Sequence, residues 1–330
     1  MILLFTNKED CHPTPVIEKL RASGVRIFRF NTECLLRDYS FFWQAGESGT
    51  DFTILCKEND LTLRGSDVTA IWDRRPEAPL PLFENTPEID KHNKAEALEF
   101  LAWLRYWLKD IPSLGSIVMD RPAASKLLQY QTALEVGFNI PRTVFCNSKG
   151  SVCQFAYGAG ELSLKELCGE GMMTADEEQQ YIFYTQKVPA EALLHTPDEA
   201  FSQTVSFIQE YIPKAYELRV TLVGDKCFAA KVYSQTQADD TGKTDWRQGS
   251  EHGLKWYVCE DYPIRELEKC RAFLKRMNLN FGCFDFIVTP NCDYVFLECN
   301  PNGQWLWVEL ETGMNISGAI ADWLKSYECK

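Results

Sequence analysis

The sequence predicts a mixed α/β protein built from two or three packed units. Its 330 residues exceed the usual size of a single hydrophobic core. Strand and helix signals alternate in the N-terminal part, and strong hairpin signals follow toward the C-terminal end. Hydrophobic residues make up 45% of the chain and charged residues 25%, which are ordinary values for a folded globular protein.

The first predicted unit spans residues 1–118 and begins with a strand, a helix and a second strand. The apolar run ILLFT at 2–6 predicts the first strand, and PTPVIEKLRASG at 13–24 predicts a short helix. Further strands are predicted by VRIFRF at 25–30, FTILC at 52–56 and TAIWDRRP at 69–76.

A long helix is predicted to complete this first unit. It extends from Asp90 to Asp110 and stops before Pro112, which cannot continue a helix. Four apolar residues recur at helical spacing along one stripe, which we expect to be buried. They are Ala97, Leu101, Leu104 and Leu108.

The second predicted unit spans residues 119–195. Pro122 indicates the start of a helix, because proline is favoured in the first helical turn. The core candidates of this helix are Leu127, Leu128 and Leu134. A strand is expected within 139–148, and GAGELSLKELCGEG at 158–171 predicts a strand that carries Lys165 between glycine-rich turns. Such turns permit close approach to a ligand, although they also serve as ordinary hairpin turns.

The third predicted unit spans residues 196–330. TPDE at 196–199 predicts a capped helix start, and LRVTLV with KCFAAKVYS predicts a hairpin that turns at 224–225. The polar segment 235–253 predicts the longest loop. Helices are expected at 263–277 and near 315–327, on either side of a last hairpin.

That last hairpin, FDFIVTPNCDYVFLECNPNGQW at 284–305, places oxygen-bearing side chains among apolar residues. With a turn near 291–292, Asp285 is expected opposite Glu298, and Asn300 shares a face with Glu298. Two carboxylates at that range repel unless a cation lies between them, and Mg²⁺ prefers oxygen ligands together with phosphate. The alternative is an exposed sheet face with ordinary acidic residues; the amide and the apolar surroundings favour a metal site.

A site that binds Mg²⁺ and phosphate also needs basic side chains. Lysine and arginine are unusual on buried strands unless they are paired or bind a ligand. Arginine offers a planar fork for phosphate oxygens, and lysine acts as a point charge. Each candidate alone could be a solvated side chain, but together they indicate a nucleotide cleft. The candidates are Lys165, Arg219, Lys231 and Arg247.

Composition excludes several other classes of protein. A net charge of −13 argues against general nucleic-acid binding, which needs a basic surface. No segment approaches the roughly 20 apolar residues of a membrane span, and the N-terminal apolar run is too short for a signal peptide. The thirteen cysteines form no CxxC pair, which indicates reduced thiols in a cytoplasmic protein.

The order of SLKEL, FIQEYIPKAYELRVTLVGDKCFAAKV and FDFIV…YVFLECNPNGQW resembles ATP-grasp ligases, which bind a nucleotide between two α+β lobes. RFNTE at 29–33, IWDRRP at 71–76 and NPNGQW resemble more closely the ATP-grasp peptide maturases of the microviridin and grasp-with-spasm type. The resemblance covers essentially the whole chain. It implies an ATP-grasp fold with an N-terminal pre-ATP-grasp α/β domain, a small central lobe and a C-terminal lobe with the Mg²⁺ site.

The resemblance also implies roles for individual residues. The residues that the resemblance assigns to nucleotide binding are Lys126, Lys165, Gln209, Glu210, Tyr211, Ile212 and Glu217. Lys231 is added to this set because of its position on a predicted strand. Within it the two other lysines bind phosphates, residues 209–212 form the hinge at the adenine, and Glu217 binds the ribose. Arg219 and Arg247 are the catalytic candidates, at the transferring phosphate and at the γ-phosphate or substrate carboxylate. The Mg²⁺ ligands are Asp285, Glu298 and Asn300.

The activity that the resemblance implies is peptide macrocyclisation driven by ATP. An Asp or Glu side chain of a ribosomal precursor peptide becomes an acyl phosphate, and a Thr or Ser hydroxyl or a Lys amine then displaces phosphate. The partners implied are a leader with a Thr/Asp/Glu-rich core and a second copy in a homodimer. Arg74 and Arg75 could meet the acidic peptide or form structural ion pairs. The alternatives are a carboxylate–amine ligase that modifies a protein tail or small metabolite, and a non-catalytic nucleotide-binding protein.

Overall fold

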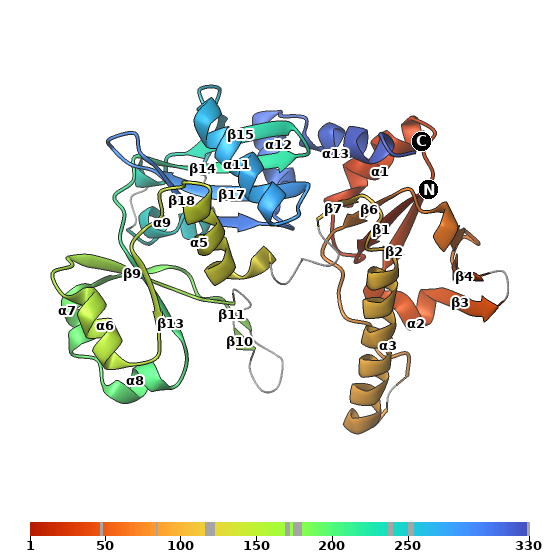
Figure 1. Ribbon diagram of the computed structural model, residues 1–330, viewed down its shortest axis with the longest axis horizontal. Coiled ribbons are helices and arrows are strands. Elements are labelled where there is room, and N and C mark those ends of the chain that lie inside the picture. The colour runs from red at the N-terminus through yellow and green to blue at the C-terminus, as the bar shows by residue number, and fades with distance from the viewer. Residues whose placement is uncertain are drawn as a thin grey trace.

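The computed structural model describes residues 1–46, 49–83, 85–115, 123–168, 172–173, 180–236, 240–249 and 254–328. Figure 1 shows two halves. One half holds the N-terminal sheets and the long helix α3 (Pro87–Trp107), and the other holds a small four-stranded sheet beneath a larger five-stranded one. The two ends of the chain lie close together in the first half, where the C-terminal helix α13 (Ile316–Lys325) lies beside α1 (Pro13–Ala22).

The N-terminal half begins with a parallel sheet of order β2-β1-β6-β7. Its elements are β1 (Ile2–Thr6), α1 (Pro13–Ala22), β2 (Ile27–Asn31), β6 (Ala70–Asp73) and β7 (Ser113–Leu114). The strands predicted at 2–6, 25–30 and 69–76 and the helix at 13–24 are thereby confirmed. Every residue of β1 and β6 is buried, because the sheet is covered on both faces.

A second, antiparallel sheet and the long helix complete this half. The sheet has the order β3-β4-β5, with short helical turns around it. The elements are η1 (Thr32–Cys34), α2 (Leu35–Asp38), β3 (Tyr39–Gly46), β4 (Gly49–Cys56), β5 (Thr62–Arg64), η2 (Gly65–Asp67) and α3 (Pro87–Trp107). The sequence did not predict β3, whose Phe41 stacks on Phe100 of α3 with ring centroids 3.9 Å apart. The predicted apolar stripe of α3 is buried, as expected.

The small sheet is antiparallel, with the order β12-β9-β13-β8. Its strands are β8 (Thr143–Cys146), β9 (Glu161–Lys165), β12 (Gln186–Pro189) and β13 (Ser206–Glu210), and the pair β10 (Met172–Met173) and β11 (Gln180–Tyr181) lies outside it. Helices α6 (Lys149–Ala156), α7 (Ala190–Leu194) and α8 (Asp198–Ser202) pack here. The predicted helix start at 196–199 is confirmed by α8, but its predicted cap is wrong, because Thr196 Oγ1 donates to Ala192 O of the preceding helix.

Helix α5 (Lys126–Glu135) packs against the last strand of the large sheet, within the second half, and its buried face differs from the prediction. Leu127 and Leu134 are 51% and 60% exposed, so their assignment to the core is wrong. The buried face instead carries Gln129, Tyr130, Thr132 and Ala133, because its polar side chains satisfy backbone groups of the neighbouring sheet. Pro122, the predicted helix start, lies outside the described residues.

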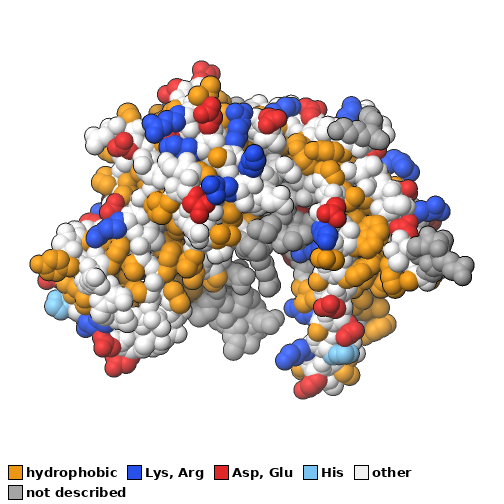
Figure 2. Space-filling model, in the orientation of Figure 1, with side chains coloured by type: hydrophobic (Ala, Val, Ile, Leu, Met, Phe, Trp, Pro, Cys, Tyr) orange, Lys and Arg blue, Asp and Glu red, His pale blue; other side chains and the backbone are white. Residues whose placement is uncertain are grey.

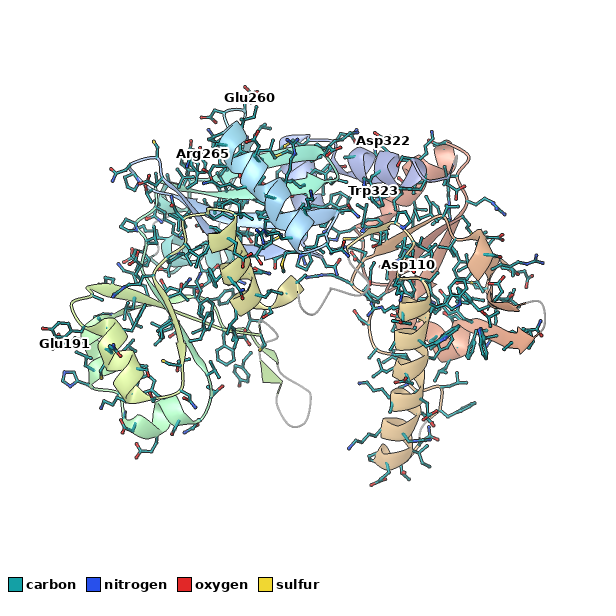
Figure 3. The ribbon with its side chains drawn as sticks, in the orientation of Figure 1. Asp110, Glu191, Glu260, Arg265, Asp322 and Trp323 are labelled. Carbon is teal, nitrogen blue, oxygen red and sulfur yellow. The ribbon has the colours of Figure 1, made fainter. Side chains whose placement is uncertain are left out.

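The large sheet has the order β16-β15-β14-β17-β18 and is antiparallel throughout. Its strands are β14 (Tyr216–Val223), β15 (Lys226–Val232), β16 (Trp256–Val258), β17 (Phe281–Val288) and β18 (Tyr294–Asn300). Both predicted hairpins are confirmed. Gly224 turns the first of them at a φ of 54°, and a Cβ there would lie 2.7 Å from Trp323, which Figure 3 labels on α13.

Helices surround this sheet. They are η3 (Ser234–Thr236), α9 (Asp240–Thr244), α10 (Trp246–Gly249), α11 (Ile264–Arg276), α12 (Leu306–Thr312) and α13 (Ile316–Lys325). The predicted helices at 263–277 and 315–327 are confirmed, and α12 was not predicted. The segment 235–253, predicted as a loop, is helical at α9 and α10, while 237–239 and 250–253 lie outside the described residues.

The C-terminal segment shares one core with the first sheet. Leu4 and Trp72 of that sheet belong to the same buried cluster as Trp305 and Ile320. This shared core holds the N-terminal half against the end of β18, and it therefore supports one side of the candidate site. The boundaries at 118/119 and 195/196 stay predictions.

Three further observations concern the surface, the thiols and the character of the helices. Figure 2 shows basic and acidic side chains interspersed on the face in view. The twelve described cysteines are free thiols. In the part of the chain that the structure describes, every helix is too short or too polar to cross a membrane.

Candidate active site

A cleft of about 700 Å³ lies between the small sheet and the large sheet. Residues from both sheets, from α5, from the α9–α10 region and from the segment after β6 line it. Twelve of the thirteen predicted site residues contribute to this lining. They are Lys126, Lys165, Gln209, Glu210, Tyr211, Ile212, Glu217, Arg219, Arg247, Asp285, Glu298 and Asn300.

Lys231 is the predicted site residue that the structure does not bring to the cleft. In β15 it pairs with Leu218, one position out of step with Arg219, so the two side chains point to opposite faces of the sheet. Its ammonium lies 4.0 Å from an Asp261 carboxylate oxygen and 5.8 Å from the centroid of the Tyr216 ring. We therefore assign it no ligand.

The register of the large sheet brings the acidic residues together. Asp285 of β17 pairs with Glu298 of β18 on one side and with Arg219 of β14 on the other, which confirms the predicted register of the last hairpin. The ladder is irregular between Asp285 and Phe286. Such an irregularity re-aims side chains locally, and here it lies beside the carboxylates.

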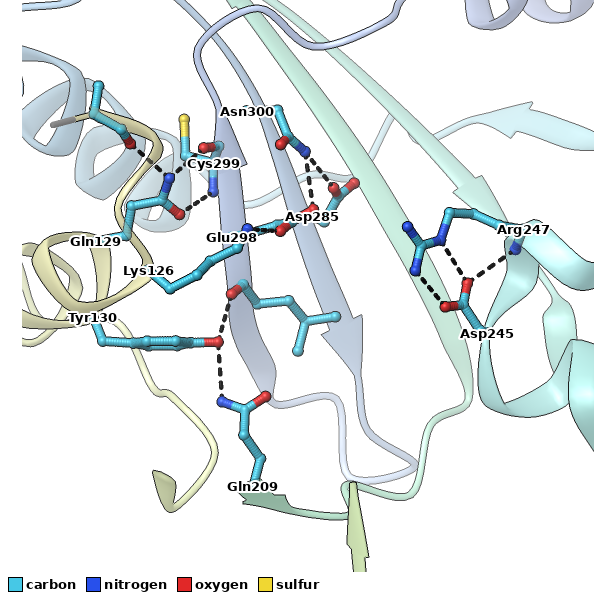
Figure 4. A network of polar contacts seen from close by, with 12 residues as sticks. Lys126, Gln129, Tyr130, Gln209, Asp245, Arg247, Asp285, Glu298, Cys299 and Asn300 are labelled. Carbon is cyan, nitrogen blue, oxygen red and sulfur yellow. Dashed lines mark hydrogen bonds and ion pairs between the residues drawn. The ribbon is translucent and has the colours of Figure 1, made fainter. Parts of the chain in front are cut away.

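Figure 4 shows the polar network around these carboxylates. Arg219 Nη1 donates to both oxygens of Asp285, at 2.8 and 2.7 Å, and the Lys126 ammonium pairs with Glu298. Asn300 Nδ2 donates to Asp285 Oδ2 at 3.2 Å and to Glu298 Oε1 at 3.0 Å. The two negative charges are thus balanced by two cations that come from different elements.

The two carboxyl groups titrate in opposite directions. Burial raises the pKa of Asp285 to about 6, and the neighbouring Glu298 adds to this effect, while the Arg219 guanidinium opposes it. Burial also tends to raise the pKa of Glu298, but the Lys126 ammonium outweighs it and holds that pKa below its usual range. Glu298 is therefore the more firmly charged of the pair.

The donor set fits a hard divalent cation. Two carboxylates and one side-chain amide, whose oxygens are the ligand types that Mg²⁺ takes from proteins, are gathered on one face of the hairpin. The amide nitrogen of Asn300 faces the carboxylates here, so this side chain would turn its carbonyl oxygen toward the ion. The surrounding cations would neutralise phosphate oxygens, which usually complete such a site. These three side chains are the ones that would hold the ion.

Lys165 reaches the cleft from the end of β9 in the small sheet. It pairs with Phe207 across the ladder, and its Nζ lies 5.9 Å from the centroid of that ring. Burial lowers the pKa of the Lys165 ammonium to about 8; the Glu298 carboxylate opposes this shift and the Lys126 ammonium adds to it. A partly desolvated ammonium of this kind gains from binding an anion.

The strand β13 leads into the predicted hinge. Gln209 Nε2 donates to Tyr130 Oη at 2.9 Å and to Thr143 Oγ1 at 2.8 Å, and Tyr130 Oη donates to Leu297 O at 2.7 Å. Sequence reasoning missed Tyr130, which joins α5, β13 and β18. The signal that could have identified it is the occurrence of Gln129 and Tyr130 beside the leucines of a helix that was expected to pack in the core.

Two further residues of the site were missed. Lys214 Nζ donates to Glu217 Oε1 and to Thr244 O, both at 2.9 Å, so it holds the predicted ribose ligand. Gly303 allows the turn after β18 to approach the site, because a Cβ there would lie 2.4 Å from Cys283 Cβ and 3.0 Å from Arg219 Nη2.

Arg247 is held in place by a buried neighbour. Its Nε donates to Asp245 Oδ1 at 2.9 Å, and the backbone N–H of Thr185 donates to Asp245 Oδ2 at 3.1 Å. Burial tends to raise the pKa of Asp245, but Arg247 outweighs it and holds the pKa below its usual value. Asp245 thereby joins α10 to the segment that precedes β12.

The two arginines after β6 have different surroundings. Arg74 is 1% exposed; its Nε lies 3.1 Å from Asp10 Oδ2, and its Nη1 donates to Asn302 O. This burial contradicts contact with a peptide and supports the structural alternative for Arg74. Arg75 is exposed and lines the cleft.

Comparisons with known proteins identify the architecture. No protein-family model and no curated relative matches the chain. Among solved structures, a Chryseobacterium gregarium RiPP-associated ATP-grasp ligase, in complex with ADP and a leader and core peptide, matches with a TM-score of 0.88 and 24% identity, over 98% of this chain and 96% of the other.

Two further solved structures match at similar coverage. Macrocyclase MdnC from Microcystis aeruginosa MRC, bound with precursor peptide MdnA, has a TM-score of 0.81 and 27% identity, over 98% of this chain and 99% of the other. ATP-grasp ligase PsnB, complexed with a phosphomimetic variant of minimal precursor, Mg and ADP, has a TM-score of 0.76 and 17% identity, over 99% of this chain and 98% of the other. Over its whole length, this chain has the ATP-grasp fold of the RiPP ATP-grasp ligases and macrocyclases.

Proposed function

We propose that this protein is an ATP-dependent peptide ligase that joins Asp or Glu side chains of a ribosomal precursor peptide to Thr or Ser hydroxyls or Lys amines. The observation that carries the proposal is the set of Arg219, Asp285, Glu298 and Asn300 in one cleft. This set lies in a chain that matches, from end to end, a macrocyclase bound with its precursor peptide.

The cleft has a group for each part of ATP. Lys126 and Lys165 bind phosphates from either side, the backbone of 209–212 binds the adenine, and Glu217 binds the ribose. Asp285, Glu298 and Asn300 would hold Mg²⁺, which would supply positive charge at the phosphate oxygens. Arg219 and Arg247 contact the transferring phosphoryl group.

The chemistry requires positioning and charge neutralisation but no covalent nucleophile on the protein. A carboxylate oxygen of the peptide attacks the γ-phosphorus of ATP, the bond to the β–γ bridging oxygen breaks, and ADP leaves with that electron pair. A hydroxyl or amine of the peptide then attacks the acyl carbon. The C–O bond to phosphate breaks, and phosphate leaves with the proton that the attacking group gives up.

Two finer features of the proposal concern the partners. We expect the core of the precursor to be rich in Thr and Asp or Glu, because those residues supply both reacting groups. We also expect the homodimer that the sequence resemblance implies. Neither feature decides the chemistry in the cleft.

The expected product is a peptide lighter by one water for each bond formed. The protein is incubated with ATP, Mg²⁺ and the peptide encoded by a short Thr/Asp/Glu-rich reading frame beside its gene, and mass spectrometry and ADP release are measured. Unchanged peptide mass with peptide-independent ADP release would contradict the macrocyclase. ADP release that depends instead on free amino acids or a protein tail would support a ligase of another class, and no ADP release at all would indicate a binding protein.

Nucleotide affinity is expected to fall as the pH rises above about 8. Phosphate binding favours the charged ammonium of Lys165, whose pKa in the free protein is about 8. The dissociation constant of ADP should therefore increase by up to about tenfold per pH unit above that value. Calorimetric titrations between pH 7 and 9.5 measure this dependence.

The matched control for the pH dependence is Lys165→Arg, which keeps the positive charge throughout that range. Its ADP affinity should show no inflection near pH 8. An inflection of the same size in both proteins, or a flat profile in the wild type, would show that Lys165 does not bind the phosphates.

A further inference from the structure

Among the residues that the structure describes, six cationic side chains line the cleft, and they differ in whether the protein supplies a carboxylate partner for each. Four of them form ion pairs: Lys126 with Glu298, Lys214 with Glu217, Arg219 with Asp285 and Arg247 with Asp245. The other two are Lys165 and Arg75, and neither forms an ion pair with any residue that the structure describes. Lys165 and Arg75 are thus the two described lining cations whose charge no described carboxylate of the protein balances, and a ligand could supply the negative charge at both.

These two cations come from opposite sides of the cleft. Lys165 ends a strand of the small sheet, where it can bind nucleotide phosphates. Arg75 follows β6 of the N-terminal sheet, and its neighbour Arg74 donates to Asn302 O in the turn after the metal-ligand strand. In that same turn, Gln304 O accepts from Arg219 Nη2 at 3.0 Å. Arg75 therefore lies beside the turn that contacts the phosphoryl-binding arginine, on the side away from the small lobe.

The backbone holds Arg75 in an unfavourable conformation. Its φ is 49°, in the left-handed region that residues with bulky side chains rarely adopt. Asn7 Nδ2 donates to Arg75 O at 2.8 Å, and the N–H of Arg74 donates to Phe5 O at 2.8 Å. Backbone strain that is held by surrounding contacts is common at functional sites. Here those contacts place the side chain at the cleft wall, at the carboxyl ends of parallel strands, where α/β sheets bind ligands.

We propose that Arg75 binds the substrate carboxylate, the Asp or Glu side chain that becomes the acyl phosphate; this inference rests on the proposed function. The carboxylate must approach a γ-phosphate that is itself negative, so a cation on the peptide side lowers the repulsion between them. The guanidinium fork matches both oxygens of a carboxylate. The other five cations already have a partner or face the nucleotide.

The variant that tests the proposal is Arg75→Gly. Because glycine adopts positive φ without strain, this change removes the side chain without distorting the backbone. We expect kcat/KM for the precursor peptide to fall by about 30-fold, mostly through KM, as for loss of a charged hydrogen bond. The ADP affinity should stay within about twofold and the melting temperature within about 3 °C of the wild type. Millimolar guanidinium ion should restore part of the lost activity.

The matched control is Arg265→Ala, which removes an exposed arginine of α11 outside the cleft (Figure 3). It should behave as the wild type. Wild-type kcat/KM in Arg75→Gly would overturn the assignment and leave the proposed function intact. An equal loss of ADP affinity would assign Arg75 to the nucleotide, and a loss without guanidinium rescue would indicate a structural role; either result overturns the proposal. Wild-type protein without peptide-dependent ADP release would remove the proposed function, and this inference with it.

Discussion

Glu298→Gln is expected to lower peptide-dependent ADP release by about a thousandfold while the protein stays folded. The change removes one charge from the proposed Mg²⁺ ligands and leaves Lys126 without its partner. Lys126 lowers the pKa of Glu298, so Glu298 is the more firmly charged of the two carboxylates. Replacing it with a neutral glutamine therefore changes the charge of the site more than the same change at Asp285 would. ADP release and thermal unfolding, measured on the same preparation, test both parts of the prediction.

Glu135→Gln is the matched control for this variant. Glu135 lies at the end of the same helix that carries Lys126, and it pairs with Arg276 at 2.7 Å outside the cleft. Loss of that exposed pair costs only about 0 to 1 kcal/mol of stability and should leave turnover unchanged. Activity of Glu298→Gln within about tenfold of the control would show that Glu298 does not hold the metal.

Arg219→Met is expected to abolish turnover and to lower the free energy of unfolding by about 3 to 5 kcal/mol. The guanidinium is almost fully buried and holds both oxygens of Asp285, so its removal leaves a largely buried carboxylate beside Glu298 with no cation to balance its charge. The pKa of Asp285, already about 6 because of burial, should rise further without the arginine. Denaturant unfolding at pH 5 and pH 8 measures the effect.

The pH dependence of that loss follows from the direction of the shift. A carboxyl group whose pKa is higher in the folded protein than its ordinary 3.8 binds more protons when folded, so stability falls as the pH rises through that interval. The destabilisation of Arg219→Met should therefore be larger at pH 8 than at pH 5. Equal losses at both values would show that Asp285 does not carry the effect.

A double variant separates stability from catalysis. Arg219→Met with Asp285→Leu replaces the whole buried pair by apolar groups, which often recovers the stability that a half-removed pair loses. We expect stability near that of the wild type and no ADP release. Activity in the double variant would exclude both residues from the chemistry.

The hairpins were predictable because their signals are local. Residues 218–232 flank a Gly-Asp turn and residues 284–300 flank a polar one, so strand type and approximate register follow from spacing. The pairing of Asp285 with Glu298 also depends on the irregularity between Asp285 and Phe286, because the register at Val288 and Tyr294 alone would place Asp285 opposite Leu297. The buried stripe of α3 follows in the same way from helical periodicity. Lys231 shows the limit of such reasoning, because the sequence places it on a strand without showing which face meets the cleft.

The errors occurred where long-range contacts decide burial. Leucines at 127 and 134 appeared to form the core of α5, but Tyr130 and Gln129 are buried instead, since their polar atoms bond to the backbone of β18. Arg74 and Arg75 are adjacent and chemically identical. One is buried against Asp10 and Asn302 and the other lines the cleft, a difference that no local pattern contains.

The sequence by itself determined most of the strands, the main helices, the approximate register of the carboxylate hairpin and the residue types that suit phosphate and Mg²⁺. These follow from interactions between neighbours in the chain, whose geometry is set by backbone periodicity. Only the tertiary structure decided which cation pairs with which carboxylate, because Lys126 and Glu298 are 172 residues apart and Arg219 and Asp285 are 66 apart. Charge balance within the cleft depends on such distant pairs. Because the carboxylates of the cleft pair with the other cations, Lys165 and Arg75 stay available to a ligand.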